Sequence, residues 1–548
     1  MNKIISLLLI TCFLILSRQI SQAGSATWVQ TPADNTWSNP SNWMPNTVPN
    51  STTDVATFGT SDTTAISIAS SIDLGSVKFQ PGASAYTLTV TNAKTLNLWG
   101  SPNIINNSGV EQNFVADGAL MVIHGTETLD STVHFDVLGN KTPENNSELS
   151  FQGNVNLGTA SIDVEGSNGP FPAGEAILGA GSNGGSSTIV LHRGVNNGAS
   201  GQLTFNGGGA GSANIIAEGA SEIGRYGGHI YFSITETAGT STITLQGPVA
   251  RGALGAILEF ELFTNASAST LVADGGSIIF HYASQGGTSR IILTHKGALD
   301  ISDLSDFESL EITIGSLEGD RTGNVFLGSK KLIVGSNNTS TVYSGVIREG
   351  GIQGGMGGSL AKIGTKTLTL TGANLYTGGT TVSEGDFLVA NPTGSATGTG
   401  SVQVEAGRIG GKGTISGPLT IGTGTGSGAI LIPPAGTTRE VTTTIQSALT
   451  FKADATYNCS VNTMTAAFDS VVANGVTIDP SATFVLHAKG NGTLSQGTVI
   501  SAINNTAATA IAGNFSGLSE GSTIVAGNNT YRVSYVGGDG NDFTLTVL

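Results

Sequence analysis

The sequence predicts an all-β protein: a right-handed parallel β-helix (solenoid) with an N-terminal cap and an antiparallel C-terminal cap. Three observations favour this fold class. Short segments of alternating apolar and polar residues follow one another along most of the 548 residues, without a helical period. Glycine numbers 79 and only 11% of residues are charged, which suits many short strands joined by Gly and Asn turns. The hydrophobic content of 38% is too high for a disordered Gly-rich linker.

The most regular part of the chain spans residues 362–389. Alternating strands are expected at 367–371, 380–382 and 387–389, separated by Gly-containing turns. A strand, turn, strand, turn, strand order is typical of one coil of a solenoid. A β-sandwich is the alternative, but the alternation continues far beyond the length of one sandwich domain. At about 20–25 residues per coil, the predicted core would be a long stack of turns.

The N-terminus, residues 1–23, resembles a signal peptide. Lys3 is followed by the apolar run 4–16, and Ser21-Gln-Ala23 offers small residues for cleavage after Ala23. We therefore predict an exported protein. Cleavage would leave one cysteine, no disulfide and no stable transmembrane segment.

Residues 24–65 form a predicted aromatic and Pro-rich N-terminal cap. Three of the four tryptophans lie here: Trp28, Trp37 and Trp43. Exposed tryptophans could stack on sugars, but a solenoid also needs a bulky cover over its apolar end, and we favour the cap.

Residues 66–432 are predicted to form the β-helix, and residues 433–548, beginning at Pro433-Pro434, the C-terminal β cap. Within the β-helix, residues 299–310 show apolar spacing of three, which favours a short amphipathic helix over an acidic cation site.

No catalytic, cofactor or metal residue is predicted. The segment Gly537-Gly-Asp-Gly-Asn-Asp542 resembles half of a calcium nonapeptide, but a single copy favours a hairpin turn. Cys459 is expected to be a buried structural thiol. The seven histidines stand singly, outside the usual metal-site spacings. They are His124, His134, His192, His229, His281, His295 and His487.

Residues 362–389 closely resemble the autotransporter-associated β-strand repeat, also called the passenger-associated repeat, of bacterial exported proteins. The resemblance is clear over residues 312–425, where it includes Asn324-Val-Phe-Leu-Gly328 and Gly411-Lys-Gly-Thr-Ile-Ser-Gly417, and it is weaker at both ends of the chain. The resemblance implies a secreted or cell-surface protein with a structural or adhesive role, not an enzyme. Its partners would be cell-surface or extracellular glycans, or host and matrix surfaces.

The alternative function is a β-helix polysaccharide lyase or hydrolase. Such an enzyme needs clustered carboxylates with an Arg or Lys base on adjacent coils, but Arg and Lys number only 22 and no such recurrence at one-coil intervals is evident in the sequence. The net charge of −16 argues against nucleic acid as a partner. No segment reads as the membrane β-barrel of autotransporters, so we expect another export route, with the periplasm as an alternative location.

Overall fold

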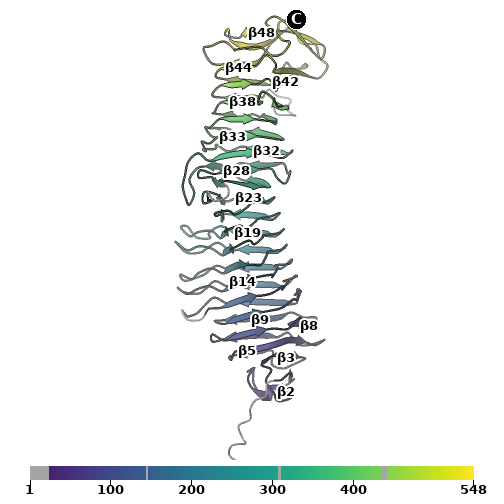
Figure 1. The fold of residues 1–548 in the computed structure, drawn as a ribbon, viewed down its shortest axis with the longest axis vertical. Helices are drawn as coiled ribbons and strands as arrows, with labels where there is room; N and C mark the ends of the chain where they lie inside the picture. Colours follow the sequence, from purple (N-terminus) through teal and green to yellow (C-terminus); the bar gives the residue numbers. More distant parts are fainter. Residues whose placement is uncertain (1–23, 143–145, 306–309, 427, 433–440) are drawn as a thin grey trace, which may run out of the picture. The chain divides into compact units, whose positions relative to one another are not determined.

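A computed structural model describes residues 24–142, 146–305, 310–426, 428–432 and 441–548. The predicted signal peptide at 1–23 and the predicted boundary at Pro433-Pro434 lie outside the described residues. The chain forms two compact units, the first ending at Gly209 and the second comprising Ala210–Leu548. Within each unit, strands of successive turns lie one above another (Figure 1).

Unit 1 is built from two sheets that share the same turns. Sheet A contains, in order, β2 (Trp43–Met44), β1 (Ala26–Trp28), β3 (Ser51–Phe58), β5 (Ile72–Phe79), β7 (Thr95–Leu98), β10 (Leu120–Ile123), β12 (Glu148–Phe151), β14 (Glu175–Gly179) and β16 (Gln202–Asn206), with β8 (Ile104–Asn106) also paired to β5. Sheet B contains β4 (Ala65–Ile68), β6 (Thr87–Thr91), β9 (Gln112–Asp117), β11 (Val133–Val137), β13 (Ser161–Val164) and β15 (Thr188–Leu191). All of these pairs are parallel except β1 with β2.

The described residues of unit 2 form four sheets. Sheet C contains β18 (His229–Phe232), β20 (Ile257–Phe260), β22 (Ser277–Phe280), β24 (Ala298–Asp300), β27 (Asn324–Phe326) and β30 (Val346–Arg348). Sheet D contains β17 (Asn214–Ala217), β19 (Thr242–Gln246), β21 (Thr270–Asp274), β23 (Arg290–Thr294), β26 (Ser316–Gly319), β29 (Thr341–Tyr343), β32 (Thr367–Leu370), β34 (Asp386–Val389), β36 (Gly407–Gly410), β39 (Ala429–Ile432), β42 (Ala455–Asn462) and β45 (Thr483–Lys489).

Sheet E of unit 2 contains β25 (Glu311–Ile314), β28 (Lys331–Val334), β31 (Ser359–Lys362), β33 (Thr380–Val382), β35 (Val402–Val404), β38 (Leu419–Ile421), β41 (Leu449–Phe451) and β44 (Val476–Ile478). Sheet F contains β37 (Thr414–Ile415), β40 (Thr442–Ile445), β43 (Ser470–Ala473), β46 (Val499–Asn505), β49 (Asp542–Val547), β48 (Asn529–Gly537) and β47 (Thr523–Ala526). Sheets C, D and E are parallel, and sheet F becomes antiparallel at β46–β49–β48–β47.

The pairing pattern confirms the predicted all-β parallel solenoid. Outside the antiparallel pairs β1–β2 and β46–β49–β48–β47, the strands pair in parallel with strands of neighbouring turns, and the described residues contain one helical turn, the 3-10 segment Pro40–Asn42. The hand of the coil, the two capping roles and the domain boundaries stay predictions. Among the described residues, no helix is long and apolar enough to cross a bilayer.

Two sequence expectations need correction. The turns are not uniformly 20–25 residues long: His134 and Ser161, paired in neighbouring turns, are 27 residues apart, whereas Asp274 and Thr294 are 20 apart. The described part of 299–310 is not helical, because β24 is held between its neighbours in sheet C and residues 301–305 form a turn. Residues 306–309 lie outside the described residues.

The core of each unit consists of side chains stacked from turn to turn. In unit 2, the rings of Phe232, Phe260 and Phe280 stack with centroids 4.9 Å apart at each step, and all three are fully buried. In unit 1, Phe135 lies between Phe114 and Phe151 at 5.4 and 5.5 Å. Alternation within each strand sends the intervening residues to the outer surface.

Candidate functional surfaces

The tryptophans of the N-terminal segment are buried and cannot present a sugar-stacking surface. Trp37 and Trp43 have no exposed area and Trp28 has 2%. Trp37 and Trp43 pack edge to face at 4.7 Å, and the indole of Trp43 donates to the carbonyl of Trp37 at 2.8 Å. Because the indole rings contact one another and the indole N–H of Trp43 bonds to a backbone carbonyl, this cluster contributes to core packing.

Cys459 is a buried thiol, as the sequence predicts. Burial raises its pKa to about 12, and Sγ donates a hydrogen bond to the carbonyl oxygen of Asp469 at 3.2 Å. A thiol in this state is not a nucleophile at neutral pH.

The Gly537–Asp542 segment is the predicted hairpin turn. It joins antiparallel strands β48 and β49, and Gly537 pairs directly with Asp542. The Asp542 carboxylate accepts a hydrogen bond from the amide of Asn505 at 2.9 Å, so this side chain serves the sheet.

The structure groups histidines with carboxylates of neighbouring turns, although the histidines stand singly in the sequence. His134 and His192 lie beside Asp163 in unit 1, and His229 and His281 lie beside Glu259 in unit 2. The histidine and its carboxylate partner are separated in the sequence by about the length of one coil, and that length varies along the chain. A search of the sequence at one fixed spacing therefore could not find these pairs.

The unit 2 group is a ladder across four turns, His229–Glu259–His281–Asp303. Glu259 contacts Nε2 of His229 at 2.6 Å and Nε2 of His281 at 3.5 Å, and Nδ1 of His281 meets Asp303 at 2.6 Å. Burial alone would lower the pKa of His281, but its contacts with the carboxylates of Glu259 and Asp303 outweigh it and raise the pKa to about 9. The hydrogen bond from His229, followed by the contact with His281, lowers the pKa of Glu259 to about 2.

Beside this ladder, the loops after β18, β20 and β22 expose apolar side chains on neighbouring turns. We call this set the apolar ridge: Ile234, Leu262, Phe263 and Tyr282, which are 41–57% exposed. The loops are joined by backbone hydrogen bonds from Thr235 to Leu262 (3.2 Å) and from Gln285 to Thr264 (2.8 Å).

Two ridge residues adopt a backbone conformation that favours glycine. Phe263 has φ of 60° and Tyr282 has φ of 46°. Large side chains pay a steric cost there, and such strain concentrates at functional sites.

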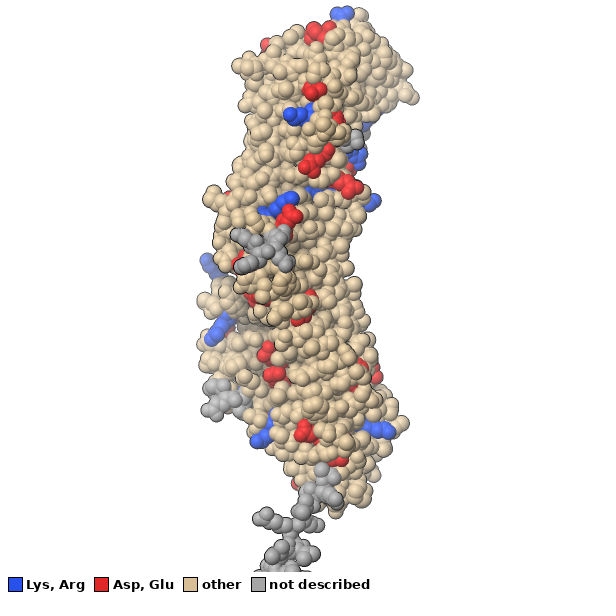
Figure 2. Space-filling model, viewed as in Figure 1, with Lys and Arg blue, Asp and Glu red and all other residues tan. Residues whose placement is uncertain are grey.

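Carboxylates border the ridge. The pKa of Tyr231 is raised, first by burial and then by the charges of Glu261 and Glu259. Tyr231 pairs directly with Glu259 across the sheet. The wider surface carries few charges, and Figure 2 shows isolated acidic and basic residues among uncharged ones on the face in view.

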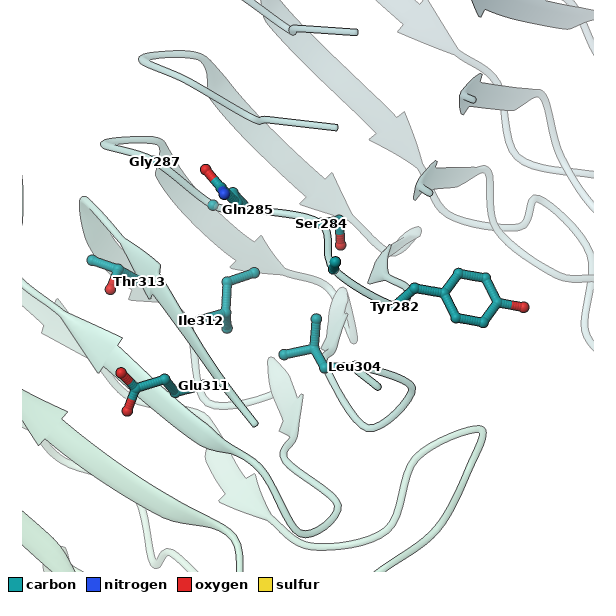
Figure 3. Close-up of a pocket in the computed structure, with 10 residues that line it drawn as sticks. Tyr282, Ser284, Gln285, Gly287, Leu304, Glu311, Ile312 and Thr313 are labelled. Carbon is teal, nitrogen blue, oxygen red and sulfur yellow. The ribbon is translucent and has the colours of Figure 1, made fainter. Parts of the chain in front are cut away.

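A cavity of about 410 Å³ lies next to Tyr282. Its lining comes from residues 282–287 together with Leu304 and 311–313, and Figure 3 shows the ring of Tyr282 directed away from Gln285 and Thr313. Glu311, at its edge, already pairs with Lys331 at 3.1 Å, and we assign the cavity no ligand.

Comparison with known proteins supports the family resemblance. Residues 360–389 match the passenger-associated-transport-repeat, within the wider interval 312–425 that the sequence suggested. No curated protein matches the chain. The crystal structure of the Haemophilus influenzae Hap adhesin is similar at 11% identity over 90% of this chain and 64% of that chain, with a TM-score of 0.23. The chain thus spans less than two thirds of that adhesin, and a score this low does not establish a shared fold.

The matched residues span parts of two successive turns of the solenoid in unit 2, because β31 pairs with β33 and β32 pairs with β34. They run from β31 to β34, and Leu368 of β32 pairs with Phe387 of β34. Buried Lys362 donates to the carbonyls of Ile363 and Gly364, both at 2.7 Å, and to that of Glu384 at 3.2 Å. The repeat is therefore an integral part of the stack, and its presence in a parallel β-solenoid supports a surface or secreted protein.

Proposed function

We propose that this chain is an exported bacterial solenoid protein, secreted or displayed at the cell surface, with a structural and adhesive role. The observation that carries the proposal is the passenger-associated repeat at 360–389, whose strands are paired with further parallel strands before and after it. A stack of turns provides a stable scaffold on which outward side chains and loops can vary.

The adhesive contact is made by the apolar ridge. Scattered single apolar residues on a surface need no explanation, but apolar residues aligned on neighbouring turns mark an interaction site. Phe263 and Tyr282 supply ring faces, and Glu259 and Glu261 supply hydrogen-bond acceptors beside them.

The ligand is a neutral glycan. Its C–H faces would pack on the rings, and its hydroxyl groups would donate to the neighbouring carboxylates. An acidic glycan would be repelled by Glu259, Glu261 and Asp303, and by the net charge of −16.

The test uses glycine substitutions at the strained positions. Phe263→Gly and Tyr282→Gly remove the side chain and also relieve a positive φ, so folding is retained or improved by up to about 1 kcal/mol. On a glycan array, both variants should lose binding at least tenfold. Ala466→Gly, with φ of 59°, is the matched control, because it relieves the same strain without removing an aromatic ring.

Unchanged binding by both ridge variants would refute the adhesive surface. A second reading of the same region is a polysaccharide lyase or hydrolase, favoured by the carboxylates and histidines on adjacent turns. Release of reducing ends or unsaturated products from a bound glycan, abolished by Glu259→Gln, would establish the enzyme and overturn the non-enzymatic proposal.

A further inference from the structure

The outer face of sheet B in unit 1 carries a cluster of metal-ligand side chains from three successive turns. β11 contributes His134 and Asp136, β13 contributes Asp163, and His192 directly follows β15. Asp136 pairs directly with Asp163 across the sheet, which places both carboxylates at the same level of the strands. This cluster is separate from the apolar ridge, and the proposal does not depend on the adhesive role.

The candidate ligand atoms converge. Nε2 of His134 lies 3.1 Å from Oδ1 of Asp136 and 3.5 Å from Oδ2 of Asp163, and Nε2 of His192 lies 3.0 Å from Oδ1 of Asp163. The ligand atoms of His134, Asp136 and Asp163 all lie within 4.8 Å of one another. Ligands about 2.0–2.1 Å from a tetrahedral ion are roughly 3.3 Å apart, which agrees with the three histidine–aspartate distances; His192 contacts Asp163 and stands outside the mutually close group of His134, Asp136 and Asp163.

A second layer of contacts orients His134. Its Nδ1 lies 2.7 Å from the hydroxyl of Ser161, which pairs with His134 across the sheet. When Nδ1 donates to this hydroxyl, the neutral ring presents the lone pair of Nε2 to the two carboxylates. A ligating histidine held by a hydrogen bond through its other nitrogen is the usual arrangement at metal sites.

The types of ligand atom in this cluster indicate which class of metal ion it would bind. Two imidazole nitrogens with carboxylate oxygens suit Zn²⁺ and similar transition metals, whereas Ca²⁺ and Mg²⁺ prefer six or more oxygens or several waters. Glu165, whose carboxylate lies 3.8 Å from Nε2 of His192, adds negative charge at the edge of the cluster. The side chains are 16–32% exposed, so an ion can reach them from solvent.

We propose that His134, Asp136, Asp163 and His192 form a transition-metal site, with Zn²⁺ as its ion, that ties together three successive turns of unit 1. An ion bound only in the folded state stabilises the turns it bridges by mass action. Metal binding would also join β11 and β15, which are not themselves neighbours in the sheet.

The experiment is titration of the EDTA-treated full chain with ZnCl₂ by calorimetry, followed by thermal unfolding. Tryptophan fluorescence reports unit 1, because all four tryptophans precede Gly209. We expect one Zn²⁺ per chain and a rise in Tm of about 5 °C at saturation. CoCl₂ should give the visible absorption of a four-coordinate ion, and CaCl₂ should not compete.

His134→Gln and Asp163→Asn should each weaken Zn²⁺ binding at least tenfold, and His229→Gln, in the other histidine group, should leave it unchanged. Circular dichroism without metal checks that the variants fold; if one does not, the Co²⁺ spectrum of the unaltered chain still decides the coordination. Absence of Zn²⁺ binding, binding unaffected by either site variant, loss of binding in His229→Gln, a six-coordinate Co²⁺ spectrum or preference for Ca²⁺ would each overturn the proposal.

Discussion

Replacing His281 by Gln should destabilise unit 2 strongly at pH 6 and weakly at pH 9.5. The His281 pKa of about 9 lies some 2.5 units above its ordinary value of 6.5, which corresponds to about 3 kcal/mol at 1.36 kcal/mol per unit. The side chain is 11% exposed and its partner Glu259 is 22% exposed, so we expect screening to reduce the loss to about 2 kcal/mol.

The sign follows from proton linkage. His281 holds its proton more tightly in the folded chain, so its contribution is complete below pH 6.5 and is lost as the pH rises to about 9. Glu259, with its pKa lowered to about 2, contributes fully above pH 4.5 and loses the contribution as the pH falls to about 2. The two contributions share the Glu259–His281 contact and do not add. The ladder is therefore most stabilising between pH 4.5 and 6.5.

The measurement is urea unfolding followed by far-UV circular dichroism, because unit 2 contains no tryptophan. The difference between wild type and variant at each pH cancels the titration of groups that do not contact His281, and Glu259 stays ionised at both pH values. His295→Gln is the control: its side chain is 79% exposed, and its pairing with Asp274 should contribute little. A His281→Gln difference that is equal at pH 6 and 9.5, or larger at pH 9.5, would refute the reasoning.

Three further outcomes test the packing of the chain. Gly372→Ala should lower the free energy of unfolding in urea by about 1–3 kcal/mol, because its Cβ would lie 1.9 Å from the carbonyl oxygen of Gly345 in the neighbouring turn. Gly59→Ala is the control and should be tolerated, because its Cβ would have no atom closer than 3.8 Å. Equal effects of the two substitutions would contradict the close approach at Gly372. Lys362→Met should cost about 2 kcal/mol because three carbonyls lose their donor, and a gain in stability would show that burying the charge costs more. Cys459 should resist thiol reagents in the native chain and react in urea; labelling without denaturant would show that it is accessible.

Local pattern was enough to predict the fold class and the central turn. The expected strands at 367–371, 380–382 and 387–389 correspond to β32, β33 and β34 with boundary shifts of one residue. Alternation of inward and outward residues is a property of each strand by itself, so the sequence displays it directly. The helix predicted at 299–310 is wrong in its described part, because the hydrogen bonds of β24 to its neighbouring strands outweigh the local apolar spacing of three residues.

The outward groupings could not be predicted because they depend on the length of each turn. His134 meets Ser161 after 27 residues, His229 meets Glu259 after 30, and His281 meets Asp303 after 22. Loops of different length between the strands set these separations, and no periodicity reveals them. The strain at Phe263 was equally hidden, since an isolated aromatic residue in a loop does not disclose its φ.

The buried columns explain how such outward groups are held in place. In β11, inward Phe135 alternates with outward His134 and Asp136, so the stacking of Phe135 on Phe114 sets the height at which both ligands emerge. A slip of one residue would place Phe135 in water and His134 in the core, which the burial of an aromatic ring strongly opposes. Outward substitutions leave this constraint intact. Loss of Zn²⁺ binding in His134→Gln should therefore occur in a chain whose core register is unchanged, whereas Phe135→Ala should weaken both folding and Zn²⁺ affinity.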